Sequence, residues 1–158
     1  SSVCLINGEE EEMKGSIRGR ERDECKDKGT YDLEALEELL AALVEASGQG
    51  AATIVEGRRD ELALRALGLT GPVIMASRRS ALDLAEDAAR SYREIILLTD
   101  WDRKGDEMAR TIEQHLWSVG SRPDGEIRSR IKKLVRKEIK DVESLHRYME
   151  RMRYLYGP

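Results

Sequence analysis

The feature that most constrains the fold of this chain is a unit repeated three times between residues 51 and 119. Each copy consists of a short apolar run, a polar turn and a segment with helical spacing. Continuous apolar strands that alternate with helices are typical of a parallel sheet covered on both faces. The sequence therefore predicts an α/β fold, a three-layer α/β/α arrangement with a mostly parallel sheet. The predicted strands are 51–55, 73–76 and 95–98, and the helices after them are 59–67, 80–91 and 106–119.

Further helices are predicted on both sides of this unit. Leucines at helical spacing over 30–49 predict an amphipathic helix, with Thr30 or Asp32 as its N-cap and Gly48 as its end. Two more helical patterns follow residue 125, and 137–140 is a weak candidate for a fourth strand. Residues 1–29 contain an acidic run and little apolar periodicity, so we expect a flexible leader.

Carboxylates follow two of the predicted strands. Glu56 closes the first strand, Asp100 closes the third, and Asp102 lies two residues further on. Ligands of open parallel sheets bind beyond the carboxyl ends of the strands, so these three side chains are expected at one edge. Crowded carboxylates repel one another unless a cation or proton lies between them. Mg²⁺ or Mn²⁺ suits such oxygen ligands, whereas no His or Cys in these motifs favours zinc.

Glycines and basic doublets accompany the carboxylates. Gly57 and Gly105 permit a positive φ or the close approach of a substrate, and the helices after them point their N-termini toward the same edge. Basic side chains in the same turns are suited to phosphate oxygens. The predicted phosphate and nucleic-acid contacts are Arg58, Arg59, Arg78, Arg79, Arg103 and Lys104.

Plainer interpretations stand beside these. Asp100 and Asp102 also fit a solvated turn with a helix cap, and the arginine doublets fit an ordinary charged surface. Asp60 is favourable in a first helical turn without any other role. His115 and His146 have no partner at ligand spacing, so we expect neither to be catalytic.

The charge is unevenly distributed along the chain. The whole chain has a net charge of −4, but residues 122–158 hold 11 basic residues against 6 acidic ones. No apolar stretch approaches the roughly 20 residues that span a bilayer, and no signal-peptide pattern is present, so no membrane contact and a cytoplasmic location are expected. A basic helix is expected to extend the contact with nucleic acid, or else to be a solvated face. Its basic residues are Arg128, Arg130, Lys132, Lys133, Arg136 and Lys137.

Two separated motifs resemble those of the Toprim domain. One is Ile-Val-Glu-Gly at 54–57, with Asp60 following, and the other is Leu-Leu-Thr-Asp-Trp-Asp at 97–102, with Gly105 following. The similarity covers about residues 50–143, where Lys140 and Asp141 look like the closing Lys-Asp segment of the family. The resemblance implies a nearly bare Toprim unit, similar to small stand-alone Toprim proteins, to ribonucleases that mature 5S ribosomal RNA and to the Toprim domain of bacterial-type primases. The polar stretch 121–126 departs from the family where a further hydrophobic strand is expected.

The resemblance implies an organisation and a set of roles. It divides the chain into the leader 1–29, an N-terminal helix 30–49, a Toprim domain 50–143 and a C-terminal helix 144–158. It implies that Glu56 is a general acid or base or a metal ligand, and that Asp100 and Asp102 hold Mg²⁺. The residues expected to support the site are Gly57, Asp60, Gly105, Lys140 and Asp141.

Two functions from different classes remain open. The first is an Mg²⁺-dependent nuclease or related phosphotransferase that processes structured RNA, with RNA favoured over DNA as the partner. The second is a non-catalytic nucleic-acid or ribonucleoprotein binding module that keeps the metal site and docks on a protein partner through helix 30–49. A receiver-like domain phosphorylated on an aspartate is disfavoured, because the junction residues are basic.

Overall fold

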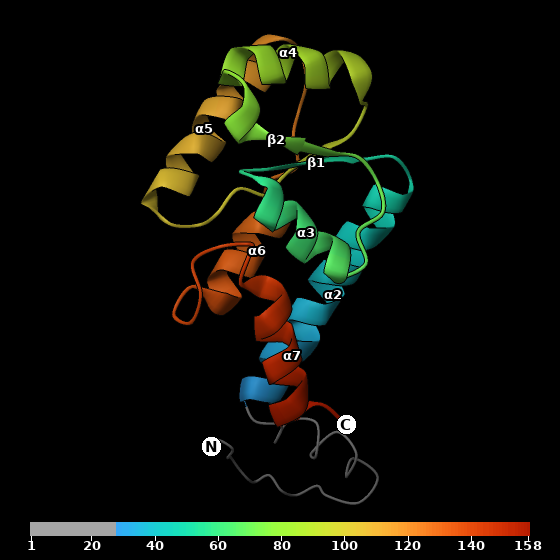
Figure 1. Cartoon of the computed structure of the whole chain (residues 1–158), viewed down its shortest axis with the longest axis vertical. Coiled ribbons are helices and arrows are strands. Elements are labelled where there is room, and N and C mark those ends of the chain that lie inside the picture. Colours follow the sequence, from blue (N-terminus) through green and yellow to red (C-terminus); the bar gives the residue numbers. More distant parts are fainter. Residues whose placement is uncertain (1–27) are drawn as a thin grey trace, which may run out of the picture.

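Three short parallel strands form the sheet of the computed structural model, which describes residues 28–158 (Figure 1). The strands are β1 (Ala52–Val55), β2 (Val73–Met75) and β3 (Ile95–Leu97), in the order β2-β1-β3. The register places Thr53 of β1 beside Val73 of β2 and Ile96 of β3. The three predicted strands are confirmed, and β1 is buried along its whole length at the centre of the sheet. The predicted leader lies almost wholly in residues 1–27, outside the described residues.

Helices α4 (Ala81–Ser91) and α5 (Arg103–Ser118) cover one face of the sheet. Ile54, Ile95 and Leu97 point to this face, because successive strand residues alternate between the two sides. They pack against a buried cluster of apolar side chains from both helices. Ser80 caps α4, since its Oγ accepts a hydrogen bond of 3.1 Å from the Asp83 amide.

Four helices cover the other face (Figure 1). Val55, Ile96 and Leu98 point to them and join a larger buried cluster that includes Trp101. The covered face completes the predicted α/β/α layering. The helices are α2 (Lys28–Gly48), α3 (Arg58–Ala66), α6 (Glu126–Val135) and α7 (Leu145–Tyr156).

The N-terminal helix differs from its prediction at its start. Helix α2 already includes Lys28, so Thr30 and Asp32 lie inside the helix and are not its N-cap. Its end at Gly48 agrees with the sequence prediction. None of the helices in residues 28–158 is both long and apolar enough to cross a membrane.

The predicted fourth strand at 137–140 is wrong. The amides of Glu138 and Ile139 donate to the Val135 carbonyl at 2.8 and 2.9 Å, so this segment continues α6 as a turn. Its residues are mostly charged and offer no apolar face to bury. Instead, Asp124 of the polar stretch forms a single parallel bridge beside Ile96. This bridge takes the edge position where an apolar strand was expected.

Candidate functional site

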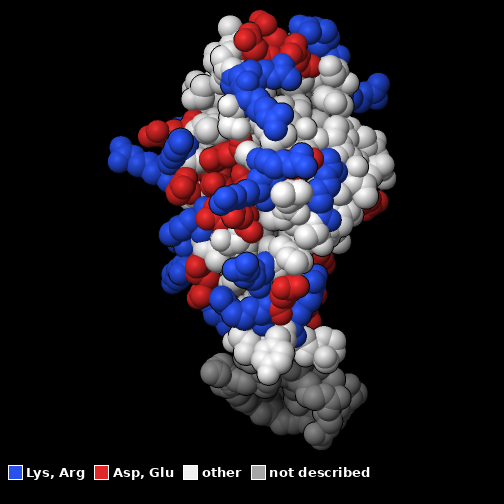
Figure 2. All heavy atoms as spheres, in the orientation of Figure 1, with Lys and Arg blue, Asp and Glu red and all other residues white. Residues whose placement is uncertain are grey.

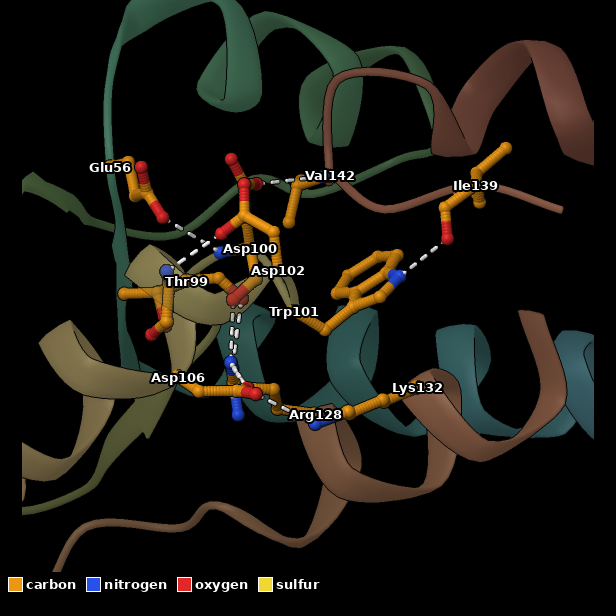
Figure 3. A network of polar contacts seen from close by, with 11 residues as sticks. Glu56, Thr99, Asp100, Trp101, Asp102, Asp106, Arg128, Lys132, Ile139 and Val142 are labelled. Atoms are coloured by element: carbon orange, nitrogen blue, oxygen red, sulfur yellow. Dashed lines mark hydrogen bonds and ion pairs between the residues drawn. The ribbon is translucent and has the colours of Figure 1, made fainter. Parts of the chain in front are cut away.

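The end of β1 is joined to the end of β3 through a side chain. Because these strands are neighbours and Ile54 is paired with Leu97, the residues that follow them meet at one edge of the sheet. The amide of Asp100 donates a hydrogen bond of 3.1 Å to Oε2 of Glu56 (Figure 3). Both carboxylates are half-buried. The sequence-predicted pair is thus brought together at the carboxyl end of the sheet.

A loop after α6 closes the site from the other side. The amide of Val142 donates a hydrogen bond of 2.9 Å to Oδ1 of Asp100 (Figure 3). The amide of Trp101 donates a hydrogen bond of 3.1 Å to the Lys140 carbonyl. The Trp101 indole also donates a hydrogen bond of 2.8 Å to the Ile139 carbonyl. This segment therefore supports the site through its backbone, while the Lys140 ammonium turns back to the Arg136 carbonyl.

Asp102 has the helix-cap role that the sequence left open. It is the N-cap of α5, and its Oδ1 accepts a hydrogen bond of 2.7 Å from the Gly105 amide. The side chain is exposed at the same edge as Glu56, whose pKa it helps to raise. The capping bond fixes one oxygen of Asp102, and the other accepts no hydrogen bond from residues 28–158.

The structure places different requirements on the two glycines of the site. Neither has a positive φ, since that conformation is found at Gly50, Gly68 and Gly120 among the described residues. Gly105 is required by packing, because a Cβ there would lie 2.0 Å from the Asp100 carbonyl oxygen. Gly57 is extended, with φ −153°, and a Cβ there would meet nothing closer than 3.9 Å. The prediction of a close substrate approach at Gly57 stays a prediction.

Burial and mutual repulsion make the site reluctant to hold all its negative charge. Burial raises the pKa of Asp100 to about 7, and the nearby carboxylates of Asp60, Glu56 and Asp141 add to the shift. Burial also raises the pKa of Glu56, with a contribution from Asp102, while the Lys104 ammonium opposes the shift. Two carboxylates of the candidate site thus carry protons more readily than carboxylates in water do.

Asp60 and Asp141 add two further carboxylates to this acidic group, and both are bound to nearby backbone amides. Asp60 is 7% exposed and accepts a hydrogen bond of 3.1 Å from the Gly57 amide in the first turn of α3. Burial raises its pKa, and the carboxylates of Glu143 and Asp141 add to the rise. Asp141 accepts a hydrogen bond of 2.8 Å from the amide of Ser144, which precedes α7. Both residues shape the field at Asp100 while they hold local backbone in place.

The carboxylates suit a hard, hydrated cation. In Glu56, Asp100 and Asp102, one oxygen is fixed by a backbone amide, and the other accepts no hydrogen bond from residues 28–158. No three acidic, His or Cys side chains in that range are arranged to hold one ion together. Mg²⁺ is commonly held by one or two carboxylates and several waters, so the residues fit such an ion in that manner.

Four of the six predicted basic contacts already have partners in ion pairs. Figure 2 shows acidic side chains at mid-height with basic side chains on either side. The ion pairs of Arg58, Arg59 and Arg103 join atoms 3.6–3.8 Å apart, and the three arginine side chains are exposed, so these pairs contribute little to stability. Arg79 is paired with Asp87 of α4. Among the described residues, Arg78 and Lys104 have no ion pair.

Arg128 is a structural residue of the site that the sequence analysis placed on a solvent-facing basic helix. Its side chain is 12% exposed and donates to the carbonyls of Thr99 and Asp100, at 2.9 and 2.5 Å, and to Asp106 (Figure 3). Lys132 donates a hydrogen bond of 2.8 Å to the same Asp106 carboxylate. Arg128 is therefore corrected from a surface contact to a largely buried support of the turn after β3, and Lys132, which is one-third exposed, contributes through Asp106. A basic residue at the core-facing spacing beside Ile127 and Ile131 was the signal available in the sequence.

Asp106 is the acidic partner that makes this support possible. Burial opposes its ionisation, but hydrogen bonds from Lys132 and Arg128 outweigh burial and hold its pKa below the ordinary value. The carboxylate is therefore charged when the turn is formed. It lies one residue after Gly105 in the first turn of α5, where negative charge is favourable by itself.

Comparison with known proteins places the fold in one family. The Toprim domain family matches residues 51–143. A UPF0292 protein of Methanosarcina barkeri is 45% identical over 125 residues, covering 79% of this chain and 87% of that protein. A UPF0292 protein of Thermococcus onnurineus is 46% identical over 112 residues, covering 70% of this chain and 80% of that protein. A solved structure from Aquifex aeolicus has a TM-score of 0.61 and 28% identity, covering 69% of this chain and 96% of that one.

Proposed function

The chain belongs to the Toprim domain family, whose members have metal-dependent functions related to nucleic acid, and on this premise we propose that it is an Mg²⁺-dependent nuclease. The observation that carries the proposal is the meeting of Glu56, Asp100 and Asp102 at the carboxyl ends of β1 and β3. Each carboxylate has one oxygen held by the backbone and one available. Such fixed carboxylates are suited to phosphoryl chemistry at a hydrated ion.

Glu56 is the residue that moves a proton in this proposal. Its raised pKa brings it closer to neutral pH, where a general acid or base is most effective. The hydrogen bond from the Asp100 amide fixes Oε2, so Oε1 is the atom that faces the substrate. Asp100 and Asp102 would hold the metal ion, which supplies charge stabilisation at the phosphoryl oxygens and an activated water.

The basic residues around the acidic group would hold the phosphates on either side of the cleaved bond. Lys104 lies close enough to Glu56 to oppose its pKa shift, and Arg78 is its counterpart on the β2 side. Arg58, Arg59 and Arg103 are held only by loose, exposed ion pairs and can exchange their carboxylate partners for phosphate. We take structured RNA as the substrate, because the two motifs resemble those of ribonucleases that mature ribosomal RNA.

A second function is favoured by two specific observations. In residues 28–158, no three ligands are arranged around a single metal position, and Asp100 holds a proton up to about pH 7. Both features also suit a module that binds nucleic acid or a ribonucleoprotein without turnover. The nuclease ranks first because every carboxylate of the site is positioned by its own backbone hydrogen bond, which binding alone does not require.

A substrate panel separates the two functions. The full chain is incubated with labelled hairpin RNA, single-stranded DNA and duplex DNA, in Mg²⁺, in Mn²⁺ and in EDTA. The nuclease proposal expects cleavage of the hairpin RNA in either metal and none in EDTA. Binding to these substrates without cleavage of any of them would reject the nuclease and support the binding module. Cleavage restricted to DNA would reject the RNA substrate and keep the chemistry.

A further inference from the structure

A groove of about 520 Å³ lies between α3 and α7, next to the acidic group of the candidate site. The two helices are in contact, and the residues that line the groove include those at the start of α7. Glu143, in its wall, is close enough to Asp60 to raise the pKa of that carboxyl. A strand of nucleic acid that leaves the candidate site on this side therefore meets the groove directly.

Cations from both helices face into this groove. Arg59 of α3 and Arg147 of α7 line it from opposite walls, together with His146. The side chain of Arg59 is 80% exposed, and its partner Glu143 is 3.8 Å away. Arg147 is exposed and has no ion pair with residues 28–158. The two guanidinium groups are thus available to an anion in the groove.

Apolar side chains of α3 also line the groove. Leu62 is 52% exposed, and Ala63 and Ala66 continue its surface along α3. Cations beside an exposed apolar surface match the two halves of a nucleotide, an anionic phosphate and a flat base with apolar faces. The volume lies in the range of pockets that hold small ligands.

We propose that this groove binds one unpaired nucleotide that flanks the phosphodiester at the candidate site. Its phosphate lies between Arg59 and Arg147, and its base lies against Leu62. The inference rests on the proposed function for the direction of the strand, but binding in the groove requires neither metal nor turnover. It implies that the substrate carries a single-stranded segment next to its paired region.

The proposal is tested by the binding of a fluorescein-labelled ten-nucleotide single-stranded RNA to the full chain in EDTA. Arg147→Gln is expected to weaken binding and to reduce the slope of log K against log salt by about 0.7, the value for one phosphate of a single strand. Arg90→Gln is the matched control, because it removes the same charge from α4 on the opposite face of the sheet. Equal effects of the two variants would overturn the proposal.

Leu62→Ala tests the place of the base. Its loss of apolar contact is expected to weaken binding about threefold and to leave the salt slope unchanged. An RNA that lacks bases should bind the wild-type chain and Leu62→Ala equally well. A difference between the two proteins on the RNA without bases would overturn the base contact. Since all binding is measured in EDTA, a failure of the nuclease proposal leaves these results unaffected. If Arg147→Gln cleaves the substrate at the wild-type rate, the groove proposal alone is rejected.

Discussion

The amide of Asp100 donates a hydrogen bond to the carboxylate of Glu56 across 3.1 Å, and this bond links two residues that are 44 positions apart. It ties the turn after β3 to the end of β1, which are neighbours in the sheet. The same Asp100 accepts a bond from Val142 through its own side chain. Three segments of the chain thus meet at one aspartate, and the properties of Asp100 give the first test of the site.

The stability of the metal-free protein should fall as the pH rises toward 7. Asp100 has a pKa of about 7 in the folded protein against an ordinary value of 3.8, so the folded state keeps a proton that the unfolded chain releases. The stabilisation is complete below the unfolded pKa and is lost as pH passes through 7. Asp100→Asn removes this loss and keeps an acceptor for the Val142 amide. Thermal unfolding in EDTA should therefore show an advantage of the variant that grows from pH 5 to pH 8.

A constant difference between the two proteins across that pH range would contradict the assigned state of Asp100.

Mg²⁺ should stabilise the folded protein more at pH 8 than at pH 6. The carboxylates must be ionised to bind a cation, and the pKa values of Asp100 and Glu56 are both raised. At a metal concentration 100 times the dissociation constant, the stabilisation is about 2.7 kcal/mol. Differential scanning fluorimetry with and without Mg²⁺ measures it, and Asp102→Asn should reduce it. Equal stabilisation of wild type and Asp102→Asn would remove Asp102 from the ligands.

Gly105→Ala should destabilise the protein strongly. The added Cβ would lie 2.0 Å from the carbonyl oxygen of Asp100, so the turn after β3 has to move. We expect a loss of about 3 kcal/mol in urea unfolding, at the upper end of what overpacking costs. Gly57→Ala is the control, because its Cβ has room and its backbone is extended, and it should cost below about 1 kcal/mol. Similar losses for both glycines would contradict the packing argument.

Arg128→Met should also destabilise the protein, by about 2–3 kcal/mol, because hydrogen bonds to a charged donor are lost in a largely buried place. Arg128→Lys should recover only part of the loss, since one ammonium cannot reproduce the fork that reaches Thr99 and Asp106 together. Arg130→Met, two residues along the same helix, removes an exposed pair with Glu126 and should cost about 0.5 kcal/mol at most. An equal cost at both arginines would show that Arg128 does not support the site.

The sequence predicted the sheet and the positions of its strands because the strands of a parallel sheet covered by helices on both faces leave apolar runs that local composition reveals. It also placed Glu56 and Asp100 at one edge, since the carboxyl ends of neighbouring parallel strands meet there. The order of the strands could not be predicted from the sequence. The single bridge at Asp124 could not be predicted either, because one polar residue forms it through its backbone.

The inner supports of the site were harder to predict. Arg128 and Lys132 have the composition of a solvated basic helix, and only the packing of α6 against the sheet shows that they reach Asp106. The contact of the Val142 amide with Asp100 depends on a loop 42 residues away in sequence. Such backbone contacts leave no residue-type signal, so a single sequence does not reveal them.

The most direct test of the account is the single-turnover rate of hairpin RNA cleavage in Mg²⁺ by wild type, Glu56→Gln and Glu126→Gln. Glu126 is an exposed control on α6, whereas Gln at position 56 keeps an acceptor for the Asp100 amide and loses only the proton chemistry. The account predicts a rate at least about 100-fold lower for Glu56→Gln, with RNA binding retained and Glu126→Gln unchanged. Wild-type cleavage that equals that of Glu56→Gln, or persists in EDTA, would contradict it.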